Sequence, residues 1–376
     1  DSWIPLAIGV LLPNGDELAA TEVLVLKAES ATWTFTPEEG WSLSDGPPAD
    51  QLPVSEAPAP ILSINRGFSA PVILDQPLAT EERLVLLAHD RDPFNRWEAG
   101  RSLAKDQLIA MVNDDATPDP AFLDALGRLA RDASLDPAFR AFALGLPSED
   151  DMARTLFEAN RTPDPGRIHL CREAITQAIA AAHSETFRAL VDDMRVSGPY
   201  RPEARDAGRR ALRMKALAMQ ARADGPELAR AIFTDADNMT ESLSSLGILV
   251  RLGAGDVEAA AFYSRWKDDP NTLDKWFALL VSQASPDQAV DVARKLTEHD
   301  QFDWKTPNRF RSVIGAFAGN TAGFHHESGK GYAFLADWLI KLDPINPQTA
   351  ARMATAFETL HQYDGDRQSL MRDALE

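Results

Sequence analysis

The spacing of apolar residues changes once along this chain, near residue 72, and does not change back. Before that point apolar side chains recur at every second position, as in Val23 and Val25, which is the period of a half-buried β-strand. From residue 79 onward they recur three and four residues apart, which is the period of an amphipathic helix. We therefore predict a mainly α protein, with a small β module at residues 1–72 and an α-helical domain at residues 73–376.

The β module is expected to be a small antiparallel sandwich. Turn residues separate its candidate strands, and Asn14-Gly15 marks a hairpin because both residues tolerate a positive φ. Strands are expected at residues 4–12, 22–28, 31–36 and 61–64. So few strands do not complete a sandwich, and the chain enters the first strand at once without a starting methionine. We therefore expect a module truncated at its N-terminus, in a chain that is the C-terminal piece of a longer protein.

The helical domain is expected to be an irregular α-solenoid of the HEAT or armadillo kind. Roughly a dozen helical segments follow one another with no strand between them, which is typical of stacked helical repeats. The connections are short and rich in Pro, Asp and Gly, and no strict sequence repeat occurs. The predicted helices include residues 94–111, 120–132, 169–182, 185–194, 204–221, 240–252, 257–266, 272–283, 286–298, 332–342 and 347–360.

Charge and composition exclude several classes of partner. The chain has 38 Lys and Arg against 57 Asp and Glu, a net charge of −19, so it lacks the basic face that nucleic-acid binding needs. No apolar run is long enough to cross a bilayer, so we expect no membrane partner. The single cysteine, Cys171, excludes an intramolecular disulfide and a cysteine-based zinc cage.

The histidines do not form a metal-binding motif. The one His-Glu pair, His326-Glu327, is followed by Lys330, where a zincin helix needs a second histidine four residues after the first. We interpret His325 and His326 as a solvated or capping loop pair, since zinc needs three or four converging ligands. Nucleophile-elbow, Walker and dinucleotide motifs are also absent from the sequence. We therefore expect no catalytic residue, no metal and no cofactor in this chain.

Two polar groups remain as candidate binding residues. Arg309 and Arg311 follow Pro307 at an expected helix start, where a cation opposes the helix dipole unless it has a partner. Gln348 and Arg352 are four residues apart, so they share one helix face. The alternatives are ordinary pairing of the arginines with surface acids, and a solvated outer face for the second pair.

Several ordered segments resemble the aminopeptidase N family of bacterial zinc metallopeptidases, which are gluzincins. In the β module they are residues 4–8 (IPLAI) and 68–72 (FSAPV). In the helical region they are residues 92–99 (DPFNRWEA), 237–240 (DNMT), 274–277 (DKWF), 307–317 (PNRFRSVIGAF), 331–335 (GYAFL) and 346–348 (NPQ). The resemblance runs in order from near residue 3 to the C-terminus, and this order makes it specific.

The resemblance implies that the chain comprises the last two domains of such an enzyme, a β-sandwich and a helical domain. The zinc ligands and catalytic residues of the family belong to a part that this sequence does not contain, so zinc is expected only in the full-length protein. Family positions matching Arg311, Gln348 and Arg352 line an internal chamber that the helical domain closes, and we include the neighbouring Arg309 with them. The implied partners are the catalytic domain of the same polypeptide and peptide substrates, and the implied location is the cytoplasm.

A second hypothesis comes from another class of protein. A free-standing helical-repeat scaffold would bind a protein partner on its concave face. The gene upstream of Asp1 separates the two hypotheses, because an in-frame HExxH segment identifies an enzyme and a start codon at that point identifies a scaffold. Neither the substrate preference nor the oligomeric state follows from this sequence.

Overall fold

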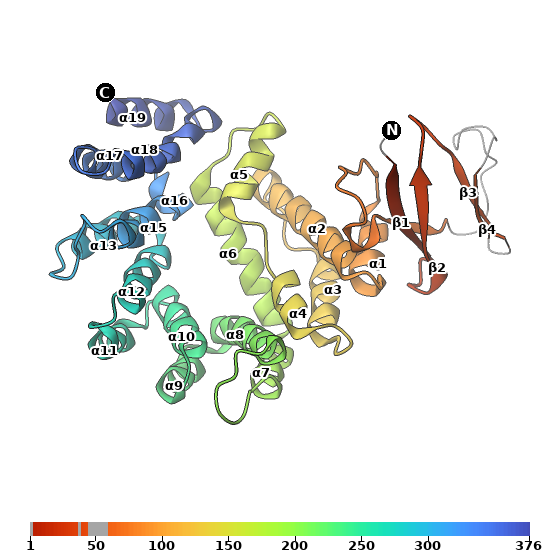
Figure 1. The fold of residues 1–376 in the computed structure, drawn as a ribbon, viewed down its shortest axis with the longest axis horizontal. Coiled ribbons are helices and arrows are strands. Elements are labelled where there is room, and N and C mark those ends of the chain that lie inside the picture. Colours follow the sequence, from red (N-terminus) through yellow and green to blue (C-terminus); the bar gives the residue numbers. More distant parts are fainter. Residues whose placement is uncertain (1–2, 37–38, 44–58) are drawn as a thin grey trace. The chain divides into compact units, whose positions relative to one another are not determined.

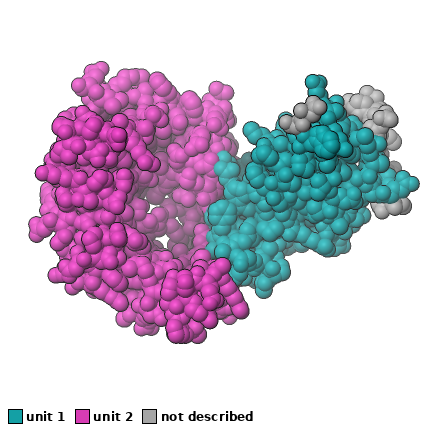
Figure 2. Space-filling view, in the orientation of Figure 1, with its two compact units in different colours: residues 1–107, 118–145 teal, residues 108–117, 146–376 magenta. Residues whose placement is uncertain are grey.

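The computed structural model describes residues 3–36, 39–43 and 59–376. The chain divides into two units, which Figure 2 colours separately. Unit 1 comprises residues 1–107 and 118–145, and unit 2 comprises residues 108–117 and 146–376. The first helices thus group with the strands, while the domain boundary at residue 72 stays a prediction.

The strands of unit 1 form two small antiparallel sheets among the described residues (Figure 1). One has the order β2-β1-β5, and the other pairs β3 with β4. Their bounds are β1 Ile4–Leu11, β2 Glu17–Leu26, β3 Trp33–Thr36, β4 Gly40–Leu43 and β5 Ile61–Ile64. The predicted hairpin turn is confirmed, since Gly15 has a φ of 91° between β1 and β2. Strand β2 begins five residues before its predicted start, because its N-terminal part pairs with the end of β1.

A buried arginine joins the larger sheet to the loop that follows the first helix. Arg66, 5% exposed, forms ion pairs with Glu17 at 2.7 Å and with Asp90 at 3.0 Å. Its Nε donates a hydrogen bond of 2.9 Å to Ser63 Oγ. Gly9 of β1 leaves room for this guanidinium, because a Cβ at that position would lie 2.0 Å from Arg66 Cζ. The strand therefore needs glycine here for a close approach and not for a positive φ.

Many helices of the chain begin with the same two-residue signal. In α3 and α4 of unit 1 an aspartate at the N-cap is followed by proline in the first turn. Asp119 accepts a hydrogen bond from the amide of Ala121, and Asp136 accepts one from the amide of Ala138. Proline suits this position because the first helical N–H has no intrahelical acceptor. The helical elements of unit 1 are η2 Arg66–Phe68, α1 Thr80–His89, α2 Pro93–Asp114 (whose last turns belong to unit 2), α3 Pro120–Arg131 and α4 Pro137–Ala143.

Unit 2 is built from helices alone among its described residues. Asn238, predicted to be a helix cap, accepts a hydrogen bond of 3.0 Å from the amide of Glu241 at the start of α10. The elements are α5 Glu149–Glu158, α6 Pro165–Ala182, α7 Ser184–Asp193, α8 Ala204–Asp224, α9 Glu227–Asp235, α10 Met239–Arg251, α11 Asp256–Trp266, α12 Pro270–Ser282, α13 Pro286–Thr297, α14 Pro307–Phe310, η3 Arg311–Gly315, α15 Ala316–Ala318, α16 Thr321–Phe324, α17 Lys330–Leu342, α18 Pro347–Ala354, η4 Thr355–Gln362 and α19 Gly365–Leu375.

The helices of unit 2 form two rows that curve around a hollow. Helices α6, α8, α10 and α12 contact one another in series, while α7, α9, α11 and α13 lie on the outer side (Figure 1). The inner row continues from α12 to η3 and α15, and α16 returns to contact α5 and α6. The row is thus a closed circuit, and the space-filling view shows unit 2 hollowed inside it (Figure 2). The predicted fold class, an irregular solenoid after a small antiparallel β module, is confirmed.

Candidate functional site

The segment that carries Arg309 and Arg311 is a helix interrupted by a π-turn. It begins with α14, continues as the π-helix η3 over Arg311–Gly315, and ends with α15. Phe310, Val313 and Ile314 are fully buried on one side, so the apolar face of the segment is fixed against the protein interior. Single π-turns are frequent at functional sites because they shift side chains off the regular helical spacing. Here the interruption begins at Arg311.

Arg309 is occupied by partners inside the protein. Its side chain is 9% exposed, and its guanidinium pairs with Asp274 of α12 and donates to the carbonyl of Gln301. The same guanidinium lies 5.0 Å from the ring centre of Phe277. These contacts link α14 to α12, so the charge of Arg309 is already neutralised within the fold.

Arg311 points to solvent. Its residue is exposed, and its Nη2 donates a hydrogen bond of 2.6 Å to Asn308 Oδ1. Among the residues that the structure describes, its guanidinium has no ion pair with an acid. The alternative of ordinary pairing with surface acids therefore applies to Arg309 and not to Arg311.

Gln348 and Arg352 are exposed on α18. The helix is held at its start by Asn346, whose Oδ1 accepts from the amide of Thr349 at 3.0 Å, and by the buried Ala350. Within the described part of the chain, neither the amide of Gln348 nor the guanidinium of Arg352 has a hydrogen bond or an ion pair. Both side chains are therefore available to a ligand.

The structure brings α18 next to the π-turn. A Cβ added at Gly315 would lie 3.4 Å from Arg311 Cβ and 3.7 Å from Met353 Cε. Arg311 and the residue that follows Arg352 thus meet at one glycine. Arg311 and α18 are neighbours, Arg309 is turned toward α12, and the lining of a chamber by these residues stays a prediction.

A charged cluster that sequence analysis missed closes the circuit of helices in unit 2. Glu149, at the start of α5, lies 2.7 Å from His169 Nδ1 and 3.6 Å from Arg172 Nη1. Its other oxygen accepts a hydrogen bond of 3.2 Å from the amide of Ala322 in α16. Burial on its own would raise the pKa of Glu149, but the contacts with His169, Arg172 and Ala322 outweigh it and lower this pKa. No local pattern could indicate the cluster, because Ala322 is 173 residues from Glu149.

The interpretation of His325 as a solvated residue is wrong, whereas its capping role is confirmed, since it stands at the C-cap of α16. His325 is 4% exposed, and its Nδ1 lies 3.0 Å from the hydroxyl of Tyr332. Its ring also lies 4.1 Å from that of Tyr363, centre to centre. Burial and the nearby charge of Arg367 lower the pKa of His325 to about 3, so the ring is neutral at physiological pH. The aromatic neighbours, which come from α17 and from the turn between η4 and α19, explain why this histidine is buried.

Metal binding receives no support from the arrangement of ligands. Across residues 3–36, 39–43 and 59–376, no group of three or more His, Cys, Asp or Glu side chains could hold a metal ion. The residues present therefore do not fit the zinc site of a metallopeptidase. Within the same residues, no helix is both long enough and apolar enough to span a membrane.

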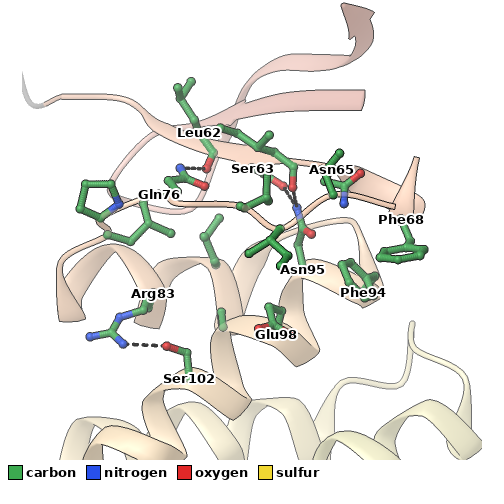
Figure 3. Close-up of a pocket in the computed structure, with 18 residues that line it drawn as sticks. Leu62, Ser63, Asn65, Phe68, Gln76, Arg83, Phe94, Asn95, Glu98 and Ser102 are labelled. Atoms are coloured by element: carbon green, nitrogen blue, oxygen red, sulfur yellow. Dashed lines mark hydrogen bonds between the residues drawn. The ribbon is translucent and has the colours of Figure 1, made fainter. Parts of the chain in front are cut away.

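A cavity of about 560 Å³ lies in unit 1, between the strand β5 and the helices α1 and α2 (Figure 3). Asn95 crosses its wall and donates to Ser63 Oγ at 2.7 Å and to the carbonyl of Ile64 at 2.9 Å. Gln76 donates to the carbonyl of Leu62 at 3.0 Å. Asn95 thus holds α2, and Gln76 holds the loop at residues 69–79, against β5, so both side-chain amide groups donate within the protein.

The family model that matches this chain covers all of unit 2 and the helices of unit 1 from α1 onward. It is described as a domain of unknown function, DUF3458_C, with ARM repeats, and it matches residues 80–376. The chain belongs to the DUF3458_C family. Its match begins at the first residue of α1, and the repeats that it names agree with the stacked helices of the structure.

Curated relatives of this DUF3458_C chain are bacterial aminopeptidases N. The protein of Caulobacter vibrioides is 38% identical over 380 residues, which cover 98% of this chain and 41% of the relative. That of Escherichia coli is 34% identical over 328 residues, with 84% and 37% covered. The chain therefore spans about two-fifths of the length of the curated relatives it matches. The resemblance to this family seen in the sequence is confirmed.

A solved structure is similar over nearly the whole chain. The crystal structure of Legionella pneumophila aminopeptidase A in complex with aspartic acid has a TM-score of 0.80 and 27% sequence identity. The match covers 99% of this chain and 43% of the Legionella chain. The fold of this DUF3458_C chain is thus one that occurs within an aminopeptidase.

Proposed function

We propose that this chain is the C-terminal, non-catalytic region of a zinc aminopeptidase that removes N-terminal residues from peptides. The observation that carries the proposal is the match to aminopeptidase N along 98% of this chain but only 41% of the relative. The catalytic domain and its zinc would then come from the remainder of the same polypeptide. Peptides are the proposed substrates, and the cytoplasm is the proposed location.

In this proposal the helical unit closes over the active-site chamber and controls the access of peptides to it. The closed inner row of helices around a hollow supports this role (Figure 2). So do three exposed side chains without an acidic partner in the described chain, Arg311, Gln348 and Arg352. Two guanidinium groups and an amide near one π-turn can bind the carboxylates and carbonyl oxygens of a peptide. Arg309 is not included, because Asp274 neutralises it.

Replacing Arg352 by alanine in the intact protein tests this role. We expect kcat/KM on peptides to fall by about ten- to hundredfold, the effect of one charge-assisted hydrogen bond, with the melting temperature nearly unchanged. Steady-state kinetics and a thermal melt measure the two quantities.

A matched control is Arg154→Ala, which removes an exposed arginine paired with Asp150 on α5. This variant should keep kcat/KM within twofold of the wild-type value, since exposed ion pairs contribute little free energy. Equal kinetics for wild type and Arg352→Ala would remove the support for a substrate-binding role of α18.

A further inference from the structure

One side of α8 is left uncovered by its neighbours. The helix contacts α6, α7, α9 and α10, and between residues 211 and 222 all but four of its residues are buried. The four are Ala211, Lys215, Ala218 and Arg222, spaced by four, three and four residues. They form one stripe along the helix. Because α7 and α9 lie on the outer side and α6 and α10 flank α8, the stripe faces the hollow of unit 2 (Figure 1).

At the C-terminal end of α8, the carboxylate of one glutamate of α6 joins this stripe to α10. Glu173 of α6 pairs with Arg222 at 2.6 Å and with Arg251 of α10 at 3.2 Å. Both of its carboxylate oxygens are therefore used. Glu149, the other acid next to Arg172, is occupied by His169 and by the amide of Ala322. These two acids are thus already paired.

Lys215 has no acidic partner on this face. In the part of the chain that the structure describes, its ammonium group forms no hydrogen bond and no ion pair, although the residue is half-buried. The charges that act on it most are cations, Arg172 of α6 and Arg222 of α8. Burial, together with these two charges, lowers the pKa of Lys215 to about 8. At neutral pH the ammonium therefore remains largely protonated, although the charges of two guanidinium groups act on it.

A lysine without an acidic partner and under the charge of two arginines is unfavourable unless an anion binds to it. A desolvated charge costs free energy when it has no partner, and nearby like charges add to that cost. An oxygen anion from outside would meet one ammonium and two guanidinium groups, whose planar N–H donors suit a carboxylate.

We propose that Lys215, Arg172 and Arg222 form an oxyanion-binding site on the hollow-facing side of unit 2, and that it takes the free C-terminal carboxylate of a peptide. The identity of the ligand as a peptide rests on the proposed function. A free inorganic oxyanion offers the same chemistry from another source. The site lies on α6 and α8, whereas Arg311 and Arg352 lie on η3 and α18, so a peptide bound at both would be held at two separate points.

The test compares two peptides of identical sequence, one with a C-terminal carboxylate and the other with a C-terminal amide. On the intact protein we expect a KM about tenfold lower for the acid than for the amide. Lys215→Met, which keeps the length and apolar stem of the side chain, should raise the KM of the acid to that of the amide and leave the amide unchanged. Lys267→Met is the matched control: it removes an exposed lysine at the C-cap of α11, in the outer row, and should change neither the KM of the acid nor that of the amide.

Calorimetric titration with inorganic phosphate separates the two ligand sources and needs no enzymatic activity. Phosphate binding that Lys215→Met abolishes, with equal KM for acid and amide peptides, assigns the oxyanion site to a free anion and overturns the peptide ligand. A Lys215→Met protein that still binds phosphate and discriminates the peptides as wild type does overturns the site altogether. An intact protein without peptidase activity would instead contradict the proposed function, while the phosphate titration would still decide the site.

Discussion

Replacing Gly9 by alanine lowers the free energy of unfolding by about 3–5 kcal/mol, as expected when a buried ion-pair network is broken. The new methyl group would lie 2.0 Å from the Cζ atom of Arg66, far inside van der Waals contact. Arg66 cannot move aside cheaply, because Glu17, Asp90 and Ser63 hold its guanidinium. Either the ion pairs or the pairing of β1 with β5 must therefore be lost.

Urea unfolding followed by circular dichroism measures this loss. Gly67→Ala is the matched control, because Gly67 lies beside Arg66 with open space around its Cα. Its φ of 65° makes alanine unfavourable there by about 1 kcal/mol through backbone strain alone. If Gly9→Ala were no more destabilising than Gly67→Ala, the close approach of β1 to Arg66 would not be rigid.

Replacing Glu149 by alanine opens the closed circuit of unit 2 and lowers stability by about 3 kcal/mol. The side chain of Glu149 is 14% exposed, so its removal leaves His169 and the amide of Ala322 without their partner. The contact between α5 and α16 should loosen first, since these groups face each other there. Hydrogen exchange of the Ala322 amide, compared with urea unfolding, should show this local loss.

The contribution of Glu149 depends on pH in a defined direction. Its pKa in the folded state lies below its ordinary value of 4.5, so the unfolded state binds the proton more readily. The stabilisation is therefore complete above pH 4.5 and is lost as the pH falls through the folded-state value. The difference in stability between wild type and Glu149→Ala should shrink over that range. Glu158→Ala, at the exposed end of α5, is the control for the loss of a glutamate from the same helix.

Local sequence signals predicted many of the helices and strands, but not the contacts that close the inner row of helices in unit 2. Asp-Pro pairs and Asn238 mark helix starts because a cap needs only the residues beside it. The hairpin at Gly15 was predictable for the same reason. The contact of Glu149 with Ala322 depends on the sum of many small rotations between successive helices, which no short segment encodes.

The candidate binding residues could likewise be predicted only in part from the local sequence. Spacing placed Gln348 and Arg352 on one exposed face of α18, as the structure has them. It did not distinguish Arg309 from Arg311, because the π-turn and the position of Asp274 on α12 decide which guanidinium is buried. The burial of His325 likewise depends on Tyr332 and Tyr363, which pack around its ring only in the folded protein. Lys215 carried no sequence signal, since its exceptional feature is that its ammonium group forms no ion pair with any residue that the structure describes.

The central claim is that this chain serves a zinc aminopeptidase whose catalytic groups lie outside residues 1–376. Metal analysis and peptidase assays on the intact protein and on residues 1–376 alone test it most directly. The intact protein should contain one tightly bound zinc per chain and release N-terminal residues from peptides. Residues 1–376 should fold, contain no stoichiometric zinc and release nothing. An intact protein without zinc and peptidase activity, or residues 1–376 that bind zinc and cleave peptides unaided, would contradict the claim.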